Sequence, residues 1–354
     1  MPATVSPHCL KFQKRLKTLG VSAYWFSHVP DLFYLSGFGC EGTWSLIGPR
    51  QATMIVPGLA LEQAQDLAKG FKIHSVKKAS DAYQLLMDTA RASNWGSIGY
   101  DPYHTPEGYM TQLRKLSGHS LKWVPVSGAT TPQRIKKDTA EITALRRAGH
   151  LVARGFAHIK KQARPGMREC DLAADFECYI RKNGAVKASF DSIVAGGENA
   201  AYPHYITGNR ILRKNDIVLC DIGCLVDGYC SDLTRTFFLG TISTLGRQIY
   251  DIVARAQRLA IQAIKPGVKT AHIDRIARDE IERAGYGRRF IHSTGHGVGV
   301  EIHEAPWVSP ASTDVLEPGM IITVEPGIYL QGWGGVRIED TLLVTKNGYE
   351  VLTK

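Results

Sequence analysis

The sequence lacks any long apolar run, and it has no cluster of basic residues interleaved with aromatic ones. A membrane-spanning helix needs roughly 20 consecutive apolar residues, so we expect no contact with a membrane. Residues 1–11 contain no continuous apolar stretch of the kind that marks a secretory signal, and we therefore expect a cytoplasmic location. The net charge is +10, but the basic excess is spread over both halves of the chain. A nucleic-acid partner is not expected, because such surfaces concentrate their basic residues.

The cysteines form no CxxC pair, and their number, seven, is odd. Neither a disulfide framework nor a zinc ribbon fits this pattern. The spacing of Cys220, Cys224 and Cys230 suits a β-hairpin better than a thiolate metal site. We expect reduced structural cysteines, as is usual in the cytoplasm.

The remaining composition is that of a globular protein, with 44% hydrophobic and 21% charged residues. A chain of 354 residues exceeds what one core usually serves, so two domains are expected. Residues 1–131 alternate strand-like and helix-like stretches and predict a small α/β domain that ends in turn and linker residues. The strand-like stretches are Val21–Val29, Ala52–Val56 and Ser97–Tyr100, and the helix-like ones are Leu59–Lys69 and Ala82–Ala92.

The second domain, residues 132–354, is expected to begin with a long helix. Apolar residues recur at helical spacing from Ile142 to Ile159. Asp138 is placed to cap the helix, and Glu141 follows three residues later, as in a capping box.

An internal repeat is the most informative feature of this domain. Pro165-Gly166 precedes an amphipathic stretch that ends at Gly184, and Pro266-Gly267 precedes another that ends at Gly285. Each copy is followed by two strand-like segments, so that both copies predict a helix and then a β-hairpin. The turn signals are Asp227-Gly228 in the first hairpin and the glycine-rich segment around Gly332 in the second.

Each arm of each hairpin carries one acidic residue within apolar surroundings. Asp221 and Asp232 lie in the first hairpin, and Glu325 and Glu339 lie in the second. A turn centred near Val226-Asp227 would place the first pair opposite each other, and a turn centred on Gly332 would do the same for the second. If the two copies pack about a pseudo-twofold axis, all four carboxylates converge.

Four converging carboxylates would repel one another strongly unless cations compensate them. Two divalent cations would do so, and a donor set rich in oxygen suits Mn, Co, Zn or Fe without selecting one of them. The alternative is four structural acids, each paired with its own cation. Arg337 and Arg235 are near enough in sequence to serve, but this interpretation leaves the repeat unexplained.

A histidine completes the predicted cluster. His296 and His303 lie in the glycine-rich segment between the second helix and the second hairpin. Their separation is odd, so a regular strand would point them to opposite faces, and both can face one site only if the chain bends at the glycines. The Gly-x-Gly-x-Gly spacing follows a helix rather than a strand, which argues against a nucleotide-binding loop.

These motifs resemble those of the Xaa-Pro aminopeptidase and prolidase group of pita-bread metallopeptidases. The segment His292–Glu304 resembles the histidine signature of the group, and Pro30–Phe38 resembles part of a creatinase-type N-terminal domain. The resemblance implies an α+β protein: a pita-bread catalytic domain with an internal pseudo-twofold repeat, preceded by a smaller creatinase-type α/β domain. It also implies five metal ligands, which are Asp221, Asp232, His296, Glu325 and Glu339.

The same resemblance assigns further roles. It makes His204 a substrate-binding residue, His303 the contact of the scissile carbonyl, and Glu325 a proton shuttle. Arg337 resembles the arginine next to the last ligand, and Tyr329 is a candidate partner of the ligands. The implied cofactors are two divalent ions per subunit, with Mn(II) preferred over Co(II), Zn(II) or Fe(II).

The implied activity is hydrolysis of the bond between an N-terminal residue and a following proline. We expect an aminopeptidase that acts on peptides with proline at the second position, and an Xaa-Pro dipeptidase is the alternative. A methionine aminopeptidase would not need the N-terminal domain, and creatinase-like chemistry works without metals. A catalytically inactive binding module would be expected to lack ligands that are present here. The resemblance further suggests a homodimer or homotetramer.

Overall fold

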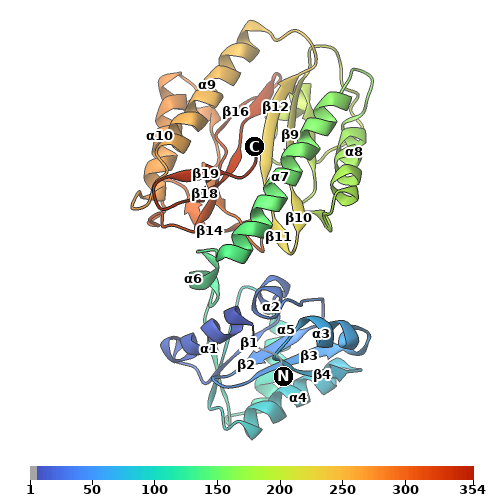
Figure 1. The fold of residues 1–354 in the computed structure, drawn as a ribbon, viewed down its shortest axis with the longest axis vertical. Coiled ribbons are helices and arrows are strands. Elements are labelled where there is room, and N and C mark those ends of the chain that lie inside the picture. The colour runs from blue at the N-terminus through green and yellow to red at the C-terminus, as the bar shows by residue number, and fades with distance from the viewer. Residues whose placement is uncertain (1–5) are drawn as a thin grey trace. The chain divides into compact units, whose positions relative to one another are not determined.

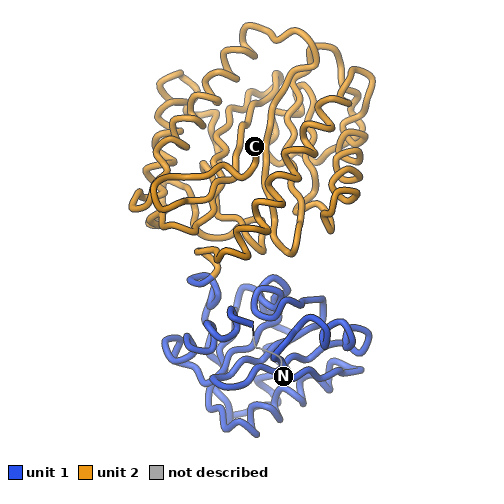
Figure 2. The backbone as a smooth tube through the Cα atoms, in the orientation of Figure 1, with its two compact units in different colours: residues 1–133 blue, residues 134–354 orange. Residues whose placement is uncertain are grey.

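The computed structural model describes residues 6–354 and divides into two compact units, 1–133 and 134–354 (Figures 1 and 2). Residues 1–5 belong to the segment in which no secretory signal is expected, and they lie outside the described residues. In the part of the chain that is described, no helix has the length and apolarity that crossing a membrane requires. The domain limits predicted from the sequence, 1–131 and 132–354, remain a prediction.

The smaller unit contains a mixed six-stranded sheet with the order β4-β3-β2-β1-β5-β6. Its strands are β1 (Ala23–Phe26), β2 (Trp44–Ile47), β3 (Ala52–Pro57), β4 (Lys72–Val76), β5 (Ser97–Tyr100) and β6 (Lys122–Pro125). Its helices are α1 (Pro7–Leu19), α2 (Val29–Ser36), the 3-10 turn η1 (Gly58–Ala60), α3 (Leu61–Leu67), α4 (Ala79–Ala92) and α5 (Glu107–Ser117). The short helix α6 (Thr131–Arg134) follows.

The strand predicted over Val21–Val29 is wrong at its end, because Val29 already begins α2. Pro30 lies in the first turn of that helix, where its missing N–H costs no hydrogen bond. Three of the strands, β2, β4 and β6, were not predicted.

The larger unit is built from four main helices and several short sheets. The helices are α7 (Thr139–Gln162), α8 (Glu169–Lys182), α9 (Thr244–Gln262) and α10 (Thr270–Arg283), with the 3-10 turns η2 (Gly197–Ala201) and η3 (Gly287–Arg289). The strands that precede α9 are β7 (Lys187–Ala188), β8 (Ile193–Gly196), β9 (Ile217–Ile222), β10 (Cys224–Val226), β11 (Tyr229–Cys230) and β12 (Leu233–Phe238). Those that follow α10 are β13 (Gly295–Gly297), β14 (Glu304–Val308), β15 (Ile321–Val324), β16 (Gly327–Leu330), β17 (Gly334–Arg337), β18 (Asp340–Val344) and β19 (Tyr349–Val351).

Two helix pairs cover the strands of this unit. One apolar core lies between α7, α8 and the sheet β12-β9-β8, and another lies between α9, α10 and the sheet β14-β13-β15-β18-β19. In Figure 1 the green pair α7 and α8 and the orange pair α9 and α10 flank the strands from two sides. The α+β pita-bread class expected from the sequence is confirmed by the relatives described below.

The capping box predicted at the start of α7 is present. Asp138 Oδ1 accepts hydrogen bonds from the backbone N–H groups of Ala140 (2.8 Å) and Glu141 (2.9 Å). Glu141 Oε2 accepts one in return from the Asp138 N–H at 2.9 Å. The helix therefore begins at the residue that its capping chemistry specifies.

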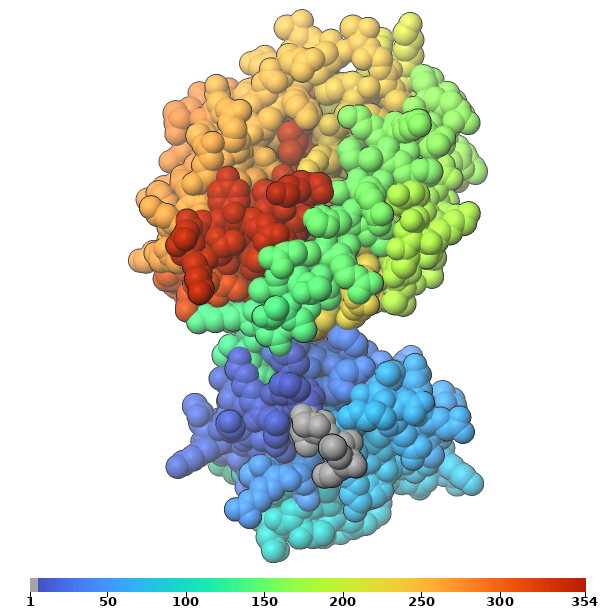
Figure 3. Space-filling model, viewed as in Figure 1, coloured from blue at the N-terminus to red at the C-terminus, as the bar shows by residue number. Residues whose placement is uncertain are grey.

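The middle of α7 packs against the C-terminal strand region. The carbonyl oxygen of Leu352 lies only 2.4 Å from the position that a Cβ atom would occupy on Gly149. Only glycine fits there, because any larger residue would force the helix and the strand region apart. In Figure 3 the green surface of α7 and the red surface of the C-terminal residues adjoin.

The internal repeat is visible in matched contacts. The N–H of Gly166 donates to the carbonyl of Leu212 at 2.8 Å, and the N–H of Gly267 donates to the carbonyl of Leu316, also at 2.8 Å. Helices α8 and α10 follow these turns and have the same length, 14 residues. The predicted repeat of a helix followed by a hairpin is confirmed in both copies.

The predicted pairing in the first hairpin is wrong. Strand β9 pairs Asp221 with Thr234, not with Asp232, which precedes β12. Asp227 (φ 51°) and Gly228 (φ 81°) both have left-handed backbones, so the turn is centred between them rather than one position earlier. This difference moves the pairing by two residues.

The predicted centre of the second hairpin is confirmed. Strand β15 pairs Val324 with Asp340, the register expected for a turn centred on Gly332. Extended by one residue, this register places Glu325 opposite Glu339. The two hairpins thus differ in how they present their acidic residues.

Candidate metal centre and catalytic cavity

Four carboxylates lie at strand positions that meet in the larger unit. Asp221 is within β9, and Asp232 comes directly before β12. Glu325 comes directly after β15, and Glu339 comes directly before β18. Pairing of β9 with β12 and of β15 with β18 brings together the acids of each hairpin, and the backbone N–H of Glu339, which donates to the carbonyl of Thr234 at 3.0 Å, joins the two hairpins.

His296 lies in β13 and faces these carboxylates. Its Nε2 atom is 3.3 Å from Glu325 Oε1 and 3.6 Å from Asp232 Oδ2. Asp232, His296 and Glu339 are all buried, and each offers a ligand atom within 4.8 Å of the others. Ligand atoms at about 2.1 Å from a shared ion lie roughly 3.4 Å apart, so these separations are those of a metal site.

The electrostatics of the cluster require positive charge. Burial, followed by the charges of neighbouring carboxylates, raises the pKa of Asp232 and of Glu339 well above the usual values. The Oε1 atom of Glu339 and the Oδ1 atom of Asp221 are buried without a hydrogen-bond partner. A buried oxygen without a partner is costly, and bound divalent cations would satisfy both atoms.

Glu325 and His296 stabilise each other's charged forms. Burial would raise the pKa of Glu325, but the hydrogen bond and the charge of His296 outweigh burial and lower it. Burial would likewise lower the pKa of His296, and the interaction with Glu325 raises it instead. The carboxylates of the cluster thus fall into two electrostatic classes, one favouring protonation and one favouring ionisation.

Arg337 is bonded to one carboxylate only. Its Nη2 atom donates to Asp221 Oδ2 at 2.5 Å, its Nε atom to Thr234 Oγ1 at 3.1 Å, and its Nη1 atom to Tyr329 Oη at 2.7 Å. Tyr329 Oη is also 2.9 Å from His292 Nε2. The alternative of four separate ion pairs therefore fails, since Asp221 alone has a guanidinium partner among the four described carboxylates.

The side chain of Arg235, the other cation considered for such pairing, points elsewhere. Its Nη2 atom donates to Asp340 Oδ1 at 2.6 Å. Asp340 also accepts a hydrogen bond from Gln257 at 2.7 Å. This contact ties β12 to β18 and leaves the cluster carboxylates without that guanidinium.

A cavity of about 370 Å³ opens onto the cluster. All the site residues predicted from the sequence line it: His204, Asp221, Asp232, His296, His303, Glu325, Arg337 and Glu339. Among the other lining residues, Phe190, Ile302 and Trp307 are apolar, and Asp191, His292 and Ser293 are polar. The cavity therefore combines a charged floor with partly apolar walls, the usual character of a small-molecule or peptide site.

The two predicted substrate histidines are both exposed residues in the lining of the cavity. The ring of His303 is 4.4 Å from that of His296, at 72°, so the chain does bend at the glycines as expected. Burial and then the charge of His296 lower the pKa of His303. His204 lines the same cavity from the segment between η2 and β9. Their roles remain predictions.

The chain segment that leads to His296 is held by α10. Asp274, which is 1% exposed, accepts hydrogen bonds from Thr294 N (3.1 Å) and Thr294 Oγ1 (2.8 Å). Asp274 also forms an ion pair with Arg278, whose Nη2 atom donates to the carbonyl of His292 at 3.0 Å. The backbone before the imidazole is thereby fixed.

Sequence reasoning assigned no role to several residues of the site. Thr234 donates to Glu339 Oε2 at 2.7 Å, and Thr323 donates to Glu325 Oε1 at 3.2 Å. Threonines at these positions are typical of any strand, so they carry no distinguishing signal. His292 is different, because its place four residues before His296 could have marked it as a further residue of the site.

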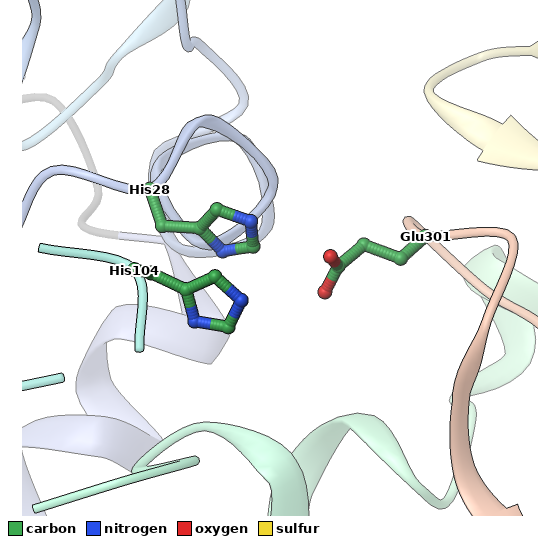
Figure 4. Close-up of side chains that lie close together, drawn as sticks. All are labelled: His28, His104 and Glu301. Carbon is green, nitrogen blue, oxygen red and sulfur yellow. The ribbon is translucent and has the colours of Figure 1, made fainter. Parts of the chain in front are cut away.

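The smaller unit contains a separate histidine pair. The rings of His28 and His104, labelled in Figure 4, are stacked, with their centroids 3.9 Å apart and their planes 18° from parallel. Within this unit, Asp31 lies 3.1 Å from His28 Nδ1, and Asp101 lies 3.5 Å from His104 Nδ1. Nearly parallel rings do not direct their in-plane lone pairs at one ion, so this arrangement differs from that around His296.

Comparisons with known proteins agree with this geometry. Residues 143–346 match the model of metallopeptidase family M24, and residues 9–136 match the creatinase/prolidase N-terminal domain. The chain belongs to metallopeptidase family M24. The family resemblance drawn from the motifs is therefore confirmed, and membership implies divalent metal ions.

M24 relatives match along nearly the whole chain. The Xaa-Pro dipeptidase of Pyrococcus furiosus is 36% identical over 325 residues, which cover 92% of this chain and 91% of the relative. The solved Xaa-Pro dipeptidase from Bacillus anthracis superposes with a TM-score of 0.93 at 34% identity, covering 98% and 97% of the two chains. The solved X-Pro aminopeptidase from Thermotoga maritima gives a TM-score of 0.88 at 31% identity, covering 96% and 97%.

Proposed function

We propose that this protein is a metal-dependent Xaa-Pro aminopeptidase, which removes the N-terminal residue from peptides with proline at the second position. The observation that carries the proposal is the convergence of four carboxylates and an imidazole, with two buried carboxylate oxygens left without partners, on the floor of one cavity. Such a donor set fits two divalent cations.

The residues divide between the two proposed metal positions. Asp232 and Glu339 would contribute to both, Asp221 to one, and His296 with Glu325 to the other. When bound, such ions polarise a peptide carbonyl and make water a nucleophile at neutral pH.

The chain's own groups would handle the substrate and the proton. The Glu325 carboxylate faces the cavity and would accept the proton of the attacking water, then deliver it to the nitrogen of the departing proline. His303, beside His296, would hydrogen-bond the oxygen of the scissile carbonyl as negative charge develops on it. Phe190 and Trp307 would exclude water and contact the proline ring.

The charges around the cavity favour peptides longer than two residues. A dipeptide ends in a carboxylate next to its proline, and a site restricted to dipeptides should offer that carboxylate a cation. Arg337 is the only Lys or Arg among the described lining residues, and its guanidinium is already bonded to Asp221, Tyr329 and Thr234. Asp191, by contrast, is exposed in the wall and would repel a terminal carboxylate.

An Xaa-Pro dipeptidase is the second candidate. It is favoured by the names of the relatives from Pyrococcus furiosus and Bacillus anthracis, both of which are Xaa-Pro dipeptidases. Purified protein would be loaded with Mn(II) and offered Ala-Pro and Ala-Pro-Ala. We expect faster hydrolysis of the tripeptide, whereas turnover of the dipeptide alone would establish the second candidate. Failure to cleave either peptide with any of the four metals would reject both candidates in favour of a binding module.

The metal, the assembly and the location form part of the same proposal. We infer Mn(II), which the family resemblance favours, with Co(II), Zn(II) and Fe(II) as the alternatives that the donor set of four carboxylates and one imidazole also suits. The family resemblance supports a homodimer or homotetramer in the cytoplasm. Activity restored to chelated protein by each metal in turn would rank the metals, and light scattering would give the subunit number.

A further inference from the structure

A second cavity adjoins the catalytic one. Its volume is about 480 Å³, and it lies between α8 and the segments 191–193 and 204–207. Asp191, Ile193 and His204 line both cavities and therefore form a common wall. A ligand that passes His204 would leave the first cavity and enter the second.

The chemistry of the proposed reaction decides which part of a substrate can reach the second cavity. This step rests on the proposed function. An aminopeptidase has only one residue before the scissile bond, so the main chain of a longer peptide can extend beyond the catalytic cavity only after the proline. The second cavity is therefore placed to receive the residue that follows proline.

The wall of the second cavity is held by buried polar contacts. Thr207 Oγ1 accepts a hydrogen bond from Val194 N and donates one to the carbonyl of Ser192, both at 2.8 Å. Tyr205 Oη donates to Glu169 Oε2 at 2.8 Å, and Glu169 is fully buried. These bonds fix both segments that form the wall, so the cavity exists before any ligand binds.

The charge in this cavity has one sign. Asp191 lies in the common wall, and Glu177 projects from α8 and accepts a hydrogen bond from Ser192 Oγ at 3.0 Å. No Lys or Arg is among the described residues that line the cavity. Ala173 and Ile206 supply apolar surface beside the carboxylates. Such a combination suits a long cationic side chain, whose methylene groups contact apolar atoms while its charge reaches a carboxylate.

We propose that the second cavity is the subsite for the residue after proline and that it selects Lys or Arg over Glu at this position. Asp191 and Glu177 provide the selection. An exposed charge pair contributes modestly, so we expect kcat/KM to favour Lys over Glu about three- to fivefold at low salt. Added salt should reduce the ratio, because these charges are partly open to solvent.

The test compares Ala-Pro-Lys, Ala-Pro-Ala and Ala-Pro-Glu, all with amidated C-termini so that no terminal carboxylate interferes. In the double variant Asp191→Asn, Glu177→Gln the Lys-to-Glu ratio should fall to about one. Asp175→Asn is the matched control, because Asp175 is an exposed acid of α8 that does not line the cavity. This control should keep the ratio of the unaltered protein.

A second substrate series places the charge before proline, in Lys-Pro-Ala and Glu-Pro-Ala amides. The proposal requires that Asp191→Asn and Glu177→Gln leave the ratio for this series unchanged. If the two substitutions alter that ratio instead, the cavity receives the first residue and the proposal is wrong. Equal rates for Ala-Pro-Lys and Ala-Pro-Glu would also overturn it. Absence of any cleavage of Ala-Pro-Ala amide would reject the proposed function itself, which separates the two failures.

Discussion

The two copies of the internal repeat share a scaffold but contribute different chemistry. The first copy supplies Asp221 and Asp232, and its first carboxylate is bonded to the guanidinium of Arg337. The second copy supplies Glu325 and Glu339, and it also supplies His296, which lies against Glu325. Duplication thus explains why the carboxylates converge, and the departures from symmetry explain why the two sides of the cluster differ electrostatically.

The largest effect is expected from removing a carboxylate that both proposed metal positions share. Glu339→Gln should lower kcat/KM by more than about 100-fold, because loss of even an indirect partner of a metal ligand costs 10–100-fold. Metal content measured on the same protein should fall as well. Glu282→Gln, an exposed acid on α10, is the control. Full activity of the Glu339 variant would show that the site does not work as proposed.

A smaller effect is expected at a buried ion cluster that joins the segment just before α7 to β14 in the second copy. Glu304 Oε1 accepts from Lys137 Nζ, and Glu304 Oε2 accepts from Arg134 Nη2, both at 2.6 Å. Burial alone would raise the pKa of Glu304, but the charges of Lys137 and Arg134 outweigh burial and lower it. A lowered pKa in the folded state means that the carboxylate stabilises the fold above its unfolded pKa of about 4.3 and loses this effect as the pH falls through the folded value.

Glu304→Gln should therefore lower the free energy of unfolding by about 3 kcal/mol at pH 7, because it removes the carboxylate partner of the buried Lys137 and one of the carboxylate partners of Arg134. The difference in the free energy of unfolding between this variant and the unaltered protein should become smaller as the pH falls below about 4. Urea unfolding between pH 7 and pH 3 measures both effects. Glu317→Gln removes the exposed partner of Lys136 and should change little. A difference that stays constant with pH would exclude the ionic explanation.

A smaller effect is expected where α10 holds the segment that leads to His296. Position 274 has no acidic counterpart in the first copy, where Ala173 occupies the matching place on α8. Asp274→Asn weakens the pairing with Arg278 and one hydrogen bond to Thr294, and it should cost about 2 kcal/mol of stability. Denaturant unfolding measures the loss, with Asp279→Asn, an exposed acid on the same helix, as control. Equal stability of the two variants would contradict the role given to Asp274.

The smallest effect is expected in the reactivity of the cysteine thiols. They distinguish the two copies, because the second copy contains no cysteine. Burial raises the pKa of Cys224 to about 11 and that of Cys230 to about 12. At pH 8 these thiols should therefore stay unreactive toward a thiol reagent in the folded protein, whereas the exposed Cys178 should react. Mass spectrometry identifies the labelled residue, and Cys178→Ser should remove its label without altering activity. Rapid labelling of Cys224 would mean that the first copy opens readily.

The sequence predicted the repeat, the capping box of α7 and the convergence of the acidic residues, because these follow from local spacing and from the cost of burying charge. It did not predict the pairing of Asp221 with Thr234, because a turn shifted by one residue changes the partner without changing the composition. The ion pair between Asp221 and Arg337 crosses from one copy to the other, and no local pattern encodes such a contact. In the sheet of the smaller unit, most of the strands that were not predicted are short and show no clear alternation of apolar and polar residues.

The core that contains α9 and α10 also includes Ala195 and Leu219 from the first copy. Each copy therefore completes the other's interior as well as its ligand set. A chain cut in the loop between β12 and α9 should yield two fragments, neither of which folds or binds metal on its own. Their mixing would restore hydrolysis only on reassociation, so peptide cleavage could serve as a readout for bringing two fused proteins together.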